Sequence, residues 1–125
     1  MEDKKPLLSI CIPTYNRAEK LKYCLQAIYD ACDDIENDKY EIIISDNASE
    51  DNTKFIVNSF QLKGMDISYN RNIKNLGFNK NWALLLSKYA NGEYCWCIGD
   101  DDFIDKDSLK YLIKLLEKNY DLLFI

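Results

Sequence analysis

The sequence predicts an α/β fold of three layers, in which helices cover both faces of a mostly parallel sheet. Short apolar runs alternate with longer amphipathic segments, which is the pattern of repeated βαβ units. Residues 41–45 are apolar on both faces, as in a central parallel strand covered by helices. The chain has 125 residues, of which 47% are hydrophobic, so we expect one packed domain over residues 1–125.

The first half of the chain predicts three strands and two helices. Residues 7–12 form a short apolar run that Pro13 ends, which is typical of a buried strand. From Arg17 onward, apolar side chains recur at the spacing of a helix packed on a sheet. They are Leu21, Cys24, Leu25, Ile28 and Cys32. Residues 41–45 form the second strand, a shorter helix around residues 56–60 closes at Gly64, and residues 65–69 form a weaker third strand.

The second half predicts two more helices and two more strands. The first of these helices carries apolar side chains at Trp82, Leu85, Leu86 and Tyr89. We expect it to end at Asn91 and Gly92, with the glycine in a left-handed cap. Residues 94–98 form a fourth strand, a last helix covers residues 109–116, and residues 122–125 begin a fifth strand. Because a terminal strand needs cover on both faces, we expect the chain to be the N-terminal part of a larger protein.

Composition excludes several classes of function. The chain has 16 basic and 21 acidic residues, and this acidic balance disfavours contact with nucleic acid or with an anionic membrane surface. No apolar segment has the length of a transmembrane helix and no secretion signal begins the chain, so we expect a cytoplasmic location. Any membrane contact would be at the inner face, through a portion that this sequence lacks. Four of the five cysteines sit within apolar patterns, and all five are interpreted as reduced core residues.

Polar residues follow the first, second and fourth predicted strands. They are residues 13–16, residues 46–47 and residues 99–102. Because ligands bind at the carboxyl ends of parallel strands, we expect these groups to meet at one edge of the sheet. With no histidine in the chain, acid–base or metal chemistry has to use carboxylates. Three adjacent carboxylates repel one another unless they share a cation, so Asp100, Asp101 and Asp102 predict a Mg²⁺ or Mn²⁺ site with ligand positions left for phosphates.

Structural interpretations of the same residues remain open at this point. The acidic run at residues 100–102 also fits a solvated loop before a helix whose first turn Asp105 and Asp107 stabilise. Asp46 also fits a turn after a strand, and Asn16 fits an N-cap before Arg17.

Four segments in order resemble family 2 glycosyltransferases with the GT-A fold. They are residues 9–17 (SICIPTYNR), residues 44–53 (ISDNASEDNT), Asn75-Leu76-Gly77 with Asn81, and residues 92–102 (GEYCWCIGDDD). The resemblance covers nearly the whole chain and implies a Rossmann-like nucleotide-diphospho-sugar transferase fold. It also implies the donor-binding half of a metal-dependent, inverting enzyme that transfers sugar from a nucleoside-diphosphate sugar, most simply a UDP-sugar. The acceptor would be a saccharide or lipid-linked saccharide in the synthesis of cell-surface polysaccharide.

The resemblance also implies roles for individual residues. The donor-binding residues would be Pro13, Thr14, Tyr15, Asn16, Arg17, Asp46, Asn47, Asn75, Gly77, Asn81, Asp100 and Asp101. Asp46 would accept hydrogen bonds from the base, and Asp100, Asp101 and Asp102 would be the DXD motif that holds the metal. Many family members carry two acids where this chain has Ser45 and Asp46. The general base and the acceptor half would lie beyond Ile125, so this chain alone is expected to bind donor and to transfer little sugar.

Two other classes of protein compete with this interpretation. A non-catalytic nucleotide-binding or assembly module would keep the fold without turnover. A phosphoacceptor receiver domain would also be a small parallel α/β unit with clustered acids. That domain needs an acidic pair after the first strand, where this chain has Pro13, Thr14 and Tyr15. An uncovered terminal strand at residues 122–125 would also allow pairing with a second copy, so a homodimer is a further expectation.

Overall fold

A computed structural model describes residues 5–118 of the chain. Its strands are β1 (Leu8–Thr14), β2 (Tyr40–Asp46), β3 (Ile67–Arg71) and β4 (Tyr94–Cys97). Its α-helices are α1 (Ala18–Ala31), α2 (Thr53–Leu62), α3 (Phe78–Leu84) and α4 (Lys106–Leu116). A short 3₁₀ turn, η1 (Asn37–Lys39), precedes β2, and a π-helical turn, η2 (Leu85–Tyr89), continues α3. The strand predicted at residues 122–125 lies outside the described residues.

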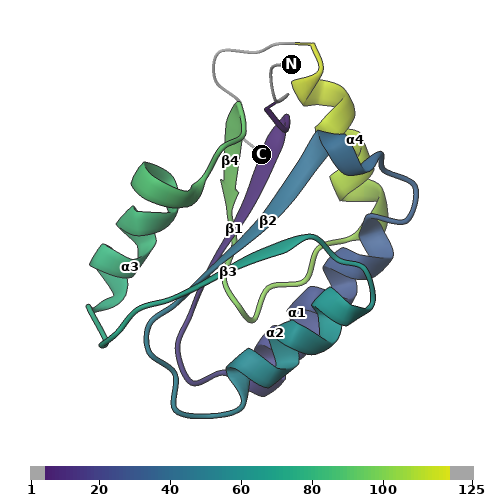
Figure 1. Cartoon of the computed structure of the whole chain (residues 1–125). Coiled ribbons are helices and arrows are strands. Elements are labelled where there is room, and N and C mark those ends of the chain that lie inside the picture. Colours follow the sequence, from purple (N-terminus) through teal and green to yellow (C-terminus); the bar gives the residue numbers. More distant parts are fainter. Residues whose placement is uncertain (1–4, 119–125) are drawn as a thin grey trace.

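The described strands form one parallel sheet in the order β3-β2-β1-β4. Ile10 of β1 is level with Ile42 of β2 and with Trp96 of β4. Because every pair is parallel, the carboxyl ends of all four strands lie along the same edge of the sheet (Figure 1). The prediction of a parallel sheet is confirmed.

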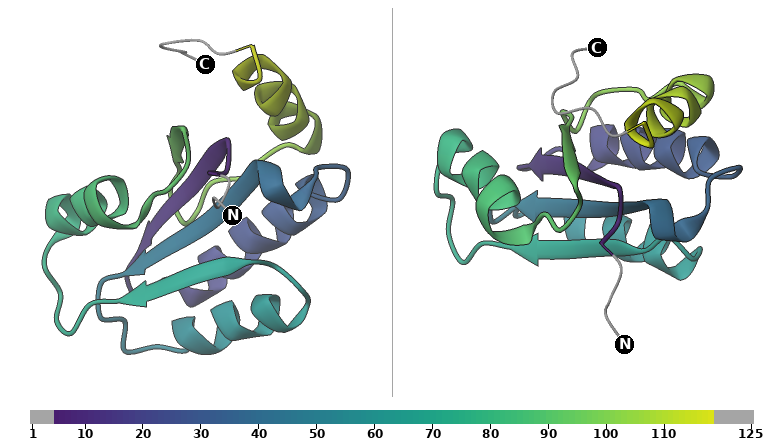
Figure 2. Two further views of the ribbon diagram at one scale, coloured as in Figure 1. Left: turned by 45° about the horizontal axis from the view of Figure 1, so that its top comes forward. Right: turned by 90° about the horizontal axis from the view of Figure 1, so that it is seen from above.

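Helices cover both faces of this sheet, which confirms the three-layer prediction (Figure 2). Alternate residues of the central strands, including Ile10 and Ile42, are fully buried in the main core, which α1, α2 and α4 complete. The residues between them, Cys11 and Ile43, point to the other face and pack with Leu85 of η2 in a smaller core. The central strands are therefore apolar on both sides because both sides are covered.

α1 and α4 bury the apolar stripes that the sequence pattern predicts, whereas Leu86 of the predicted third stripe is exposed. α1 buries Leu21, Cys24, Leu25 and Ile28, and α4 buries Leu109, Leu112, Ile113 and Leu116. Asp105 is the N-cap of α4, and its carboxylate accepts a hydrogen bond from the backbone N–H of Ser108. Gly64 follows α2 with a φ of +102°, a left-handed conformation that suits glycine.

The predicted end of the first strand at Pro13 is wrong, because β1 continues through Pro13 to Thr14. The carbonyl of Cys11 accepts from Ile98 on the β4 side, whereas the carbonyl of Thr14 accepts from Asn47 on the β2 side. Pro13 therefore faces the β4 side at a level where β4 has already ended. Its missing N–H costs no hydrogen bond between strands.

The left-handed cap predicted at Gly92 is also wrong. Within the described residues, positive φ angles occur at Asn16, Ala48, Gly64 and Gly77. Gly92 is needed for a different reason, since a Cβ there would lie 2.7 Å from the Ser9 Oγ and 2.8 Å from the Ser9 backbone nitrogen. The turn before β4 thus passes so close to β1 that no side chain fits.

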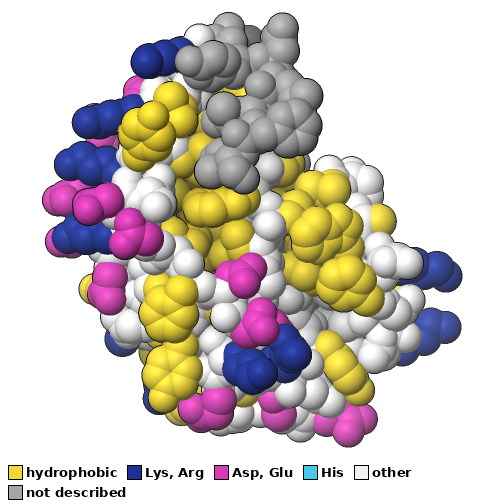
Figure 3. All heavy atoms as spheres, turned by 180° about the vertical axis from the view of Figure 1, so that it is seen from behind, with side chains coloured by type: hydrophobic (Ala, Val, Ile, Leu, Met, Phe, Trp, Pro, Cys, Tyr) yellow, Lys and Arg dark blue, Asp and Glu magenta, His cyan; other side chains and the backbone are white. Residues whose placement is uncertain are grey.

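The surface of the described chain is not uniformly polar. Seen from behind, hydrophobic side chains gather in the middle of the face, and charged side chains gather along one flank (Figure 3). The exposed large apolar side chains include Ile73, Phe78 and Phe103. All five cysteines are free, but the prediction that all of them are core residues is wrong, because Cys95 is exposed. Over residues 5–118, no helix combines the length and the hydropathy that crossing a membrane requires.

Candidate functional site

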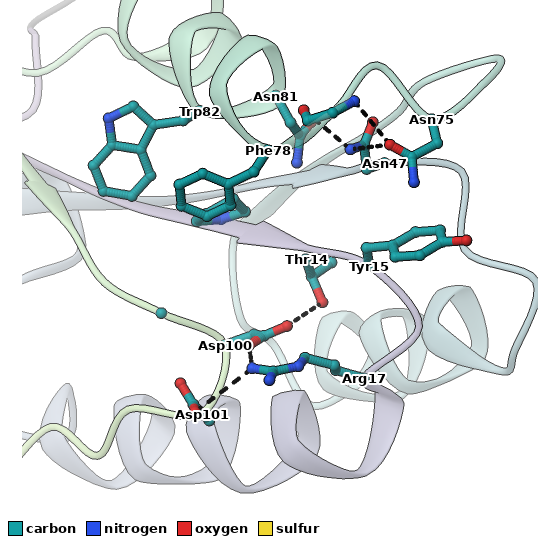
Figure 4. Close-up of a pocket in the computed structure, with 13 residues that line it drawn as sticks. Thr14, Tyr15, Arg17, Asn47, Asn75, Phe78, Asn81, Trp82, Asp100 and Asp101 are labelled. Carbon is teal, nitrogen blue, oxygen red and sulfur yellow. Dashed lines mark hydrogen bonds and ion pairs between the residues drawn. The ribbon is translucent and has the colours of Figure 1, made fainter.

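A cavity of about 630 Å³ lies at the carboxyl edge of the sheet (Figure 4). It is lined by Pro13, Thr14, Tyr15, Arg17, Asn47, Asn75, Gly77, Phe78, Asn81, Trp82, Gly99, Asp100 and Asp101. The structure therefore brings together most of the residues that the sequence predicts as a site. Asn16, Asp46 and Asp102 do not line the cavity.

One wall of the cavity is built from an ion-paired carboxylate cluster. Asp100 is only 5% exposed, and its Oδ2 accepts a hydrogen bond of 2.9 Å from the Thr14 hydroxyl. Its Oδ1 accepts from the Arg17 Nη1 at 3.0 Å, and the same nitrogen lies 3.5 Å from the Asp101 Oδ2. The hydrogen bond and the charge of Asp100 raise the pKa of Arg17 above its usual value. A buried carboxylate is stable here because both of its oxygens have partners.

The opposite wall is held by Asn47, which joins two loops. Its amide nitrogen donates to the Asn75 Oδ1 at 2.7 Å and to the Gly77 carbonyl at 3.2 Å. Its amide oxygen accepts from the backbone N–H of Leu76 at 2.8 Å and from the Asn72 side chain at 3.1 Å. The loop from β3 to α3 is thereby fixed to the end of β2.

Asn81 anchors α3 to the same strand end. It is 2% exposed, and its Oδ1 accepts from the Ser45 hydroxyl at 2.7 Å and from the Asn72 amide at 2.9 Å. Its amide nitrogen donates to the Ser45 carbonyl at 2.9 Å. Among the described residues, no buried side-chain nitrogen or oxygen lacks a partner. The amide network is complete, which favours a rigid wall over an adaptable one.

Asp46 lies beneath the cavity rather than on its surface. It is fully buried, and its Oδ1 accepts hydrogen bonds from the Ser49 backbone N–H and from the Ser49 hydroxyl. Its Oδ2 accepts from the hydroxyl of Tyr69. Burial, together with this bond to a carboxylate, raises the pKa of Tyr69. Both oxygens of Asp46 are thus used to hold the loop after β2, and its predicted contact with a base stays a prediction.

Asn16 does not cap α1. It connects the loop after β1 to the loop after β2 by hydrogen bonds. With a φ of +50°, its backbone N–H donates to the Ser49 hydroxyl and its side-chain oxygen accepts from the Glu50 N–H. The first N–H of α1, at Ala18, is satisfied by Asp51 at 3.1 Å. The interpretation of Asn16 as an N-cap is wrong, because a carboxylate from the next loop satisfies this N–H.

Asp51 is a supporting residue that the sequence pattern did not single out. Burial raises its pKa, but hydrogen bonds from Thr53 and from Ala18 outweigh burial and lower the pKa below the usual value. Asn72 is a second such residue. It directly follows β3, as Asn47 follows β2, so polarity at the end of the third strand was the signal that could have found it.

Asp102 is turned toward its own loop. Its Oδ2 accepts a hydrogen bond of 2.7 Å from the backbone N–H of Gly99. Within the described residues, no three acidic or sulfur side chains converge as a cluster that could hold a metal alone. Asp100 and Asp101 remain as a pair of carboxylates that could hold a metal, and Asp101 is half exposed toward the cavity. An oxygen pair fits a Mg²⁺ or Mn²⁺ ion that takes its other ligands from water and phosphate.

Two aromatic side chains of α3 form a further wall of the cavity. The rings of Phe78 and Trp82 are stacked with their centroids 5.9 Å apart, and the Phe78 side chain is 69% exposed. The sequence pattern uses Trp82 only as one of the apolar side chains that mark its helix. The structure places it beside the cavity, across from Asp100 (Figure 4). Periodicity identified the helix, but it could not tell which apolar positions face a cavity.

Proteins named as sugar transferases are similar to this chain in sequence and in fold. The chain is 42% identical to abequosyltransferase RfbV of Salmonella typhimurium over 117 residues, which cover 93% of this chain and 34% of that protein. It superposes on Staphylococcus aureus TarS in complex with UDP-GlcNAc with a TM-score of 0.74 at 27% identity. It superposes on the mannosyltransferase PcManGT of Pyrobaculum calidifontis, in complex with GDP-Man and Mn²⁺, with a TM-score of 0.77 at 25% identity.

These similarities extend over most of this chain but over only part of its relatives. The two superpositions each cover 90% of this chain and 31% or 33% of the other. The chain thus spans about a third of the length of the proteins it matches. The family model described as Glycosyl transferase family 2 matches residues 9–125. With its parallel sheet and the cavity at the strand ends, this chain belongs to glycosyltransferase family 2 and has the GT-A fold.

Proposed function

We propose that this chain is the donor-binding part of a metal-dependent glycosyltransferase that takes sugar from a nucleoside-diphosphate sugar. The observation that carries the proposal is the convergence of Thr14, Arg17, Asp100 and Asp101 at one cavity wall. A guanidinium beside an exposed carboxylate supplies the two kinds of group that hold a metal diphosphate. The solved relatives with UDP-GlcNAc and with GDP-Man and Mn²⁺ support this ligand class.

In this proposal Asp100 and Asp101 hold a Mg²⁺ or Mn²⁺ ion on the donor diphosphate. The ion, when bound, neutralises the charge that grows on the departing nucleoside diphosphate. Asp100 brings a carboxylate that its partners already orient, and Asp101 brings a half-exposed one. Asp102 takes a supporting role, because its hydrogen bond to Gly99 shapes the loop that carries the other two.

The nucleoside lies toward Tyr15 in this proposal. Tyr15 is 43% exposed and lines the end of the cavity away from Trp82, so its ring offers a free face for a base (Figure 4). The sugar then lies toward Phe78 and Trp82, whose rings provide an apolar surface. UDP remains the first candidate nucleotide, and GDP the second.

The acceptor is proposed to be a saccharide or lipid-linked saccharide used for cell-surface polysaccharide. A relative named as an abequosyltransferase supports a saccharide-building role. The general base for the acceptor hydroxyl is proposed to lie outside this chain, which spans about a third of its relatives. The cytoplasmic location and the homodimer stay predictions from the sequence.

Isothermal titration of the chain with UDP and GDP, first with Mn²⁺ and then with a chelator, tests the proposal. We expect one nucleotide to bind with Mn²⁺ and to lose most of its affinity when the metal is chelated or when Asp101 is replaced in Asp101→Ala. Asp33→Ala removes the same charge from an exposed loop at the far end of the strands and serves as the control. If nucleotide affinity depends neither on the metal nor on Asp101, the result favours a non-catalytic nucleotide-binding module instead.

A further inference from the structure

The guanidinium of Arg17 occupies the position between Asp100 and Asp101 that a cation would take. One nitrogen, Nη1, lies 3.0 Å from the Asp100 Oδ1 and 3.5 Å from the Asp101 Oδ2. The Arg17 side chain is 46% exposed and comes from the first loop, whereas both carboxylates belong to the loop after β4. The negative charges of these two carboxylates are therefore paired with a positive charge from the same chain.

The burial of Asp100 makes this pairing important. The Asp100 side chain is only 6% exposed, so its charge needs a neutralising partner, and the Thr14 hydroxyl supplies a hydrogen bond but no charge. A divalent cation at the same carboxylates would bring two positive charges next to the guanidinium. Like charges at that distance repel, so the metal and Arg17 compete for the same oxygens.

A diphosphate bound in the cavity would give Arg17 a second anionic partner. The Arg17 side chain lines the cavity together with Asp101 and Tyr15, and Arg17 comes two positions after Tyr15 in the loop that follows β1. A diphosphate bound in that cavity would offer the bidentate oxygen pairs that guanidinium groups prefer. A half-exposed side chain can rotate toward such a ligand without opening the core.

We propose that Arg17 is a built-in counter-ion that holds the two carboxylates before metal arrives and transfers to the donor diphosphate when metal takes its place. This inference rests on the proposed function. Under this proposal metal and nucleotide bind cooperatively, because the guanidinium that the metal displaces becomes a contact for the diphosphate. Arg17 is then a positioning residue for the metal and a direct contact for the donor.

Arg17→Gln separates this role from a purely structural one. Without the competing charge, we expect Mn²⁺ alone to bind about tenfold more tightly, the lower end of what one adjacent unit charge does to proton binding. We expect the nucleotide with saturating Mn²⁺ to bind at least about tenfold more weakly, because a charged contact to phosphate is lost. Free Mn²⁺ measured by its paramagnetic resonance signal gives the first affinity, and isothermal titration gives the second.

Two further variants complete the test. Arg17→Lys keeps a cation beside the carboxylates and guards against loss of the fold, so its Mn²⁺ affinity should stay near that of the wild type. Arg71→Gln removes the same charge from the end of β3, where the guanidinium donates to the Ser49 carbonyl, and should leave the Mn²⁺ affinity unchanged. Circular dichroism checks the fold of each variant.

The outcomes distinguish the inference from the proposed function. If wild type binds nucleotide with Mn²⁺ but Arg17→Gln leaves Mn²⁺ affinity unchanged, or weakens metal and nucleotide alike, the counter-ion role is refuted and donor binding stands. If wild type binds neither UDP nor GDP with any metal, the proposed function fails and this inference fails with it. If Arg17→Gln binds Mn²⁺ more tightly and nucleotide more weakly than wild type, the counter-ion role and the proposed function are both supported.

Discussion

The hydroxyl of Thr14 and the carboxylate of Asp100 are 86 positions apart in the sequence and 2.9 Å apart in the structure. This hydrogen bond connects the end of β1, in the middle of the sheet, to the loop that follows β4. It is buried, so it fixes the position of Asp100 in the fold before any ligand is present. Site geometry and fold stability therefore depend on the same pair of residues.

Thr14→Val should destabilise the fold by about 1–3 kcal/mol, because a buried carboxylate loses a hydrogen-bond donor. Thr14→Ser keeps the hydroxyl and should cost much less. Urea denaturation followed by circular dichroism measures both values. A Thr14→Val chain as stable as wild type would mean that Arg17 alone satisfies Asp100.

Asn81→Ala should destabilise the fold by about 2–3 kcal/mol, because it removes three hydrogen bonds and leaves the buried Ser45 hydroxyl without its acceptor. Nucleotide affinity should fall as well, since α3 forms part of the cavity. Asn79→Ala is the matched control, because Asn79 lies on the same helix and is exposed. Equal losses in both variants would contradict a specific role for the amide network.

Gly92→Ala and Gly64→Ala should be destabilising for different reasons. At Gly92 the new methyl group would meet the backbone nitrogen of Ser9 at 2.8 Å, so β1 or the turn has to shift, at a cost of about 1–3 kcal/mol. At Gly64 nothing lies within 4 Å, and only the left-handed backbone opposes the change, at a cost of about 1 kcal/mol. Gly64→Asn should recover part of the loss, whereas Gly92→Asn should not.

Asp51 should make the stability of the chain fall in acid. Its pKa in the folded state lies below the usual value of 3.8, so the stabilisation is complete above that value and is lost as the pH falls through the folded pKa. Urea midpoints measured between pH 6 and pH 2.5 should therefore decrease less steeply in Asp51→Asn than in wild type. Asp33→Asn should follow the wild-type curve, and identical curves for all three would remove Asp51 from this role.

Tyr15→Ala should weaken nucleotide binding about tenfold or more, as expected for the loss of one base stacked on an aromatic ring. Tyr15→Phe keeps the ring and should retain most of the affinity. Tyr23→Ala alters a similarly exposed tyrosine on α1, outside the cavity, and should have no effect. Titration of the three variants with UDP and Mn²⁺ provides the comparison.

The sequence predicted the parts of the site that follow from strand ends. Pro13, Thr14, Asn47 and Asp100 follow or end buried apolar runs, and parallel strands bring such positions to one edge. Local pattern therefore sufficed for the sheet and for the location of the cavity. It also sufficed for α1 and α4, whose apolar stripes are regular.

The remaining details depend on contacts between segments far apart in the chain. The Asp51 carboxylate accepts a hydrogen bond from the backbone N–H of Ala18, 33 residues away. A glycine is required at position 92 because the backbone there lies close to Ser9, 83 residues away. No periodicity encodes such partners. Asp102 looked equivalent to Asp100 in sequence, yet a single backbone hydrogen bond turns it toward Gly99.

The strand order also determines when each strand can pair during synthesis on a ribosome. β1 is made first, but its second neighbour, β4, is made last among the described strands. At roughly 5–20 residues per second, the ribosome needs on the order of several seconds after β2 to complete β4. During that interval the edge of β1 that later pairs with β4 has no partner strand, and an unpaired apolar edge is a point of vulnerability to aggregation.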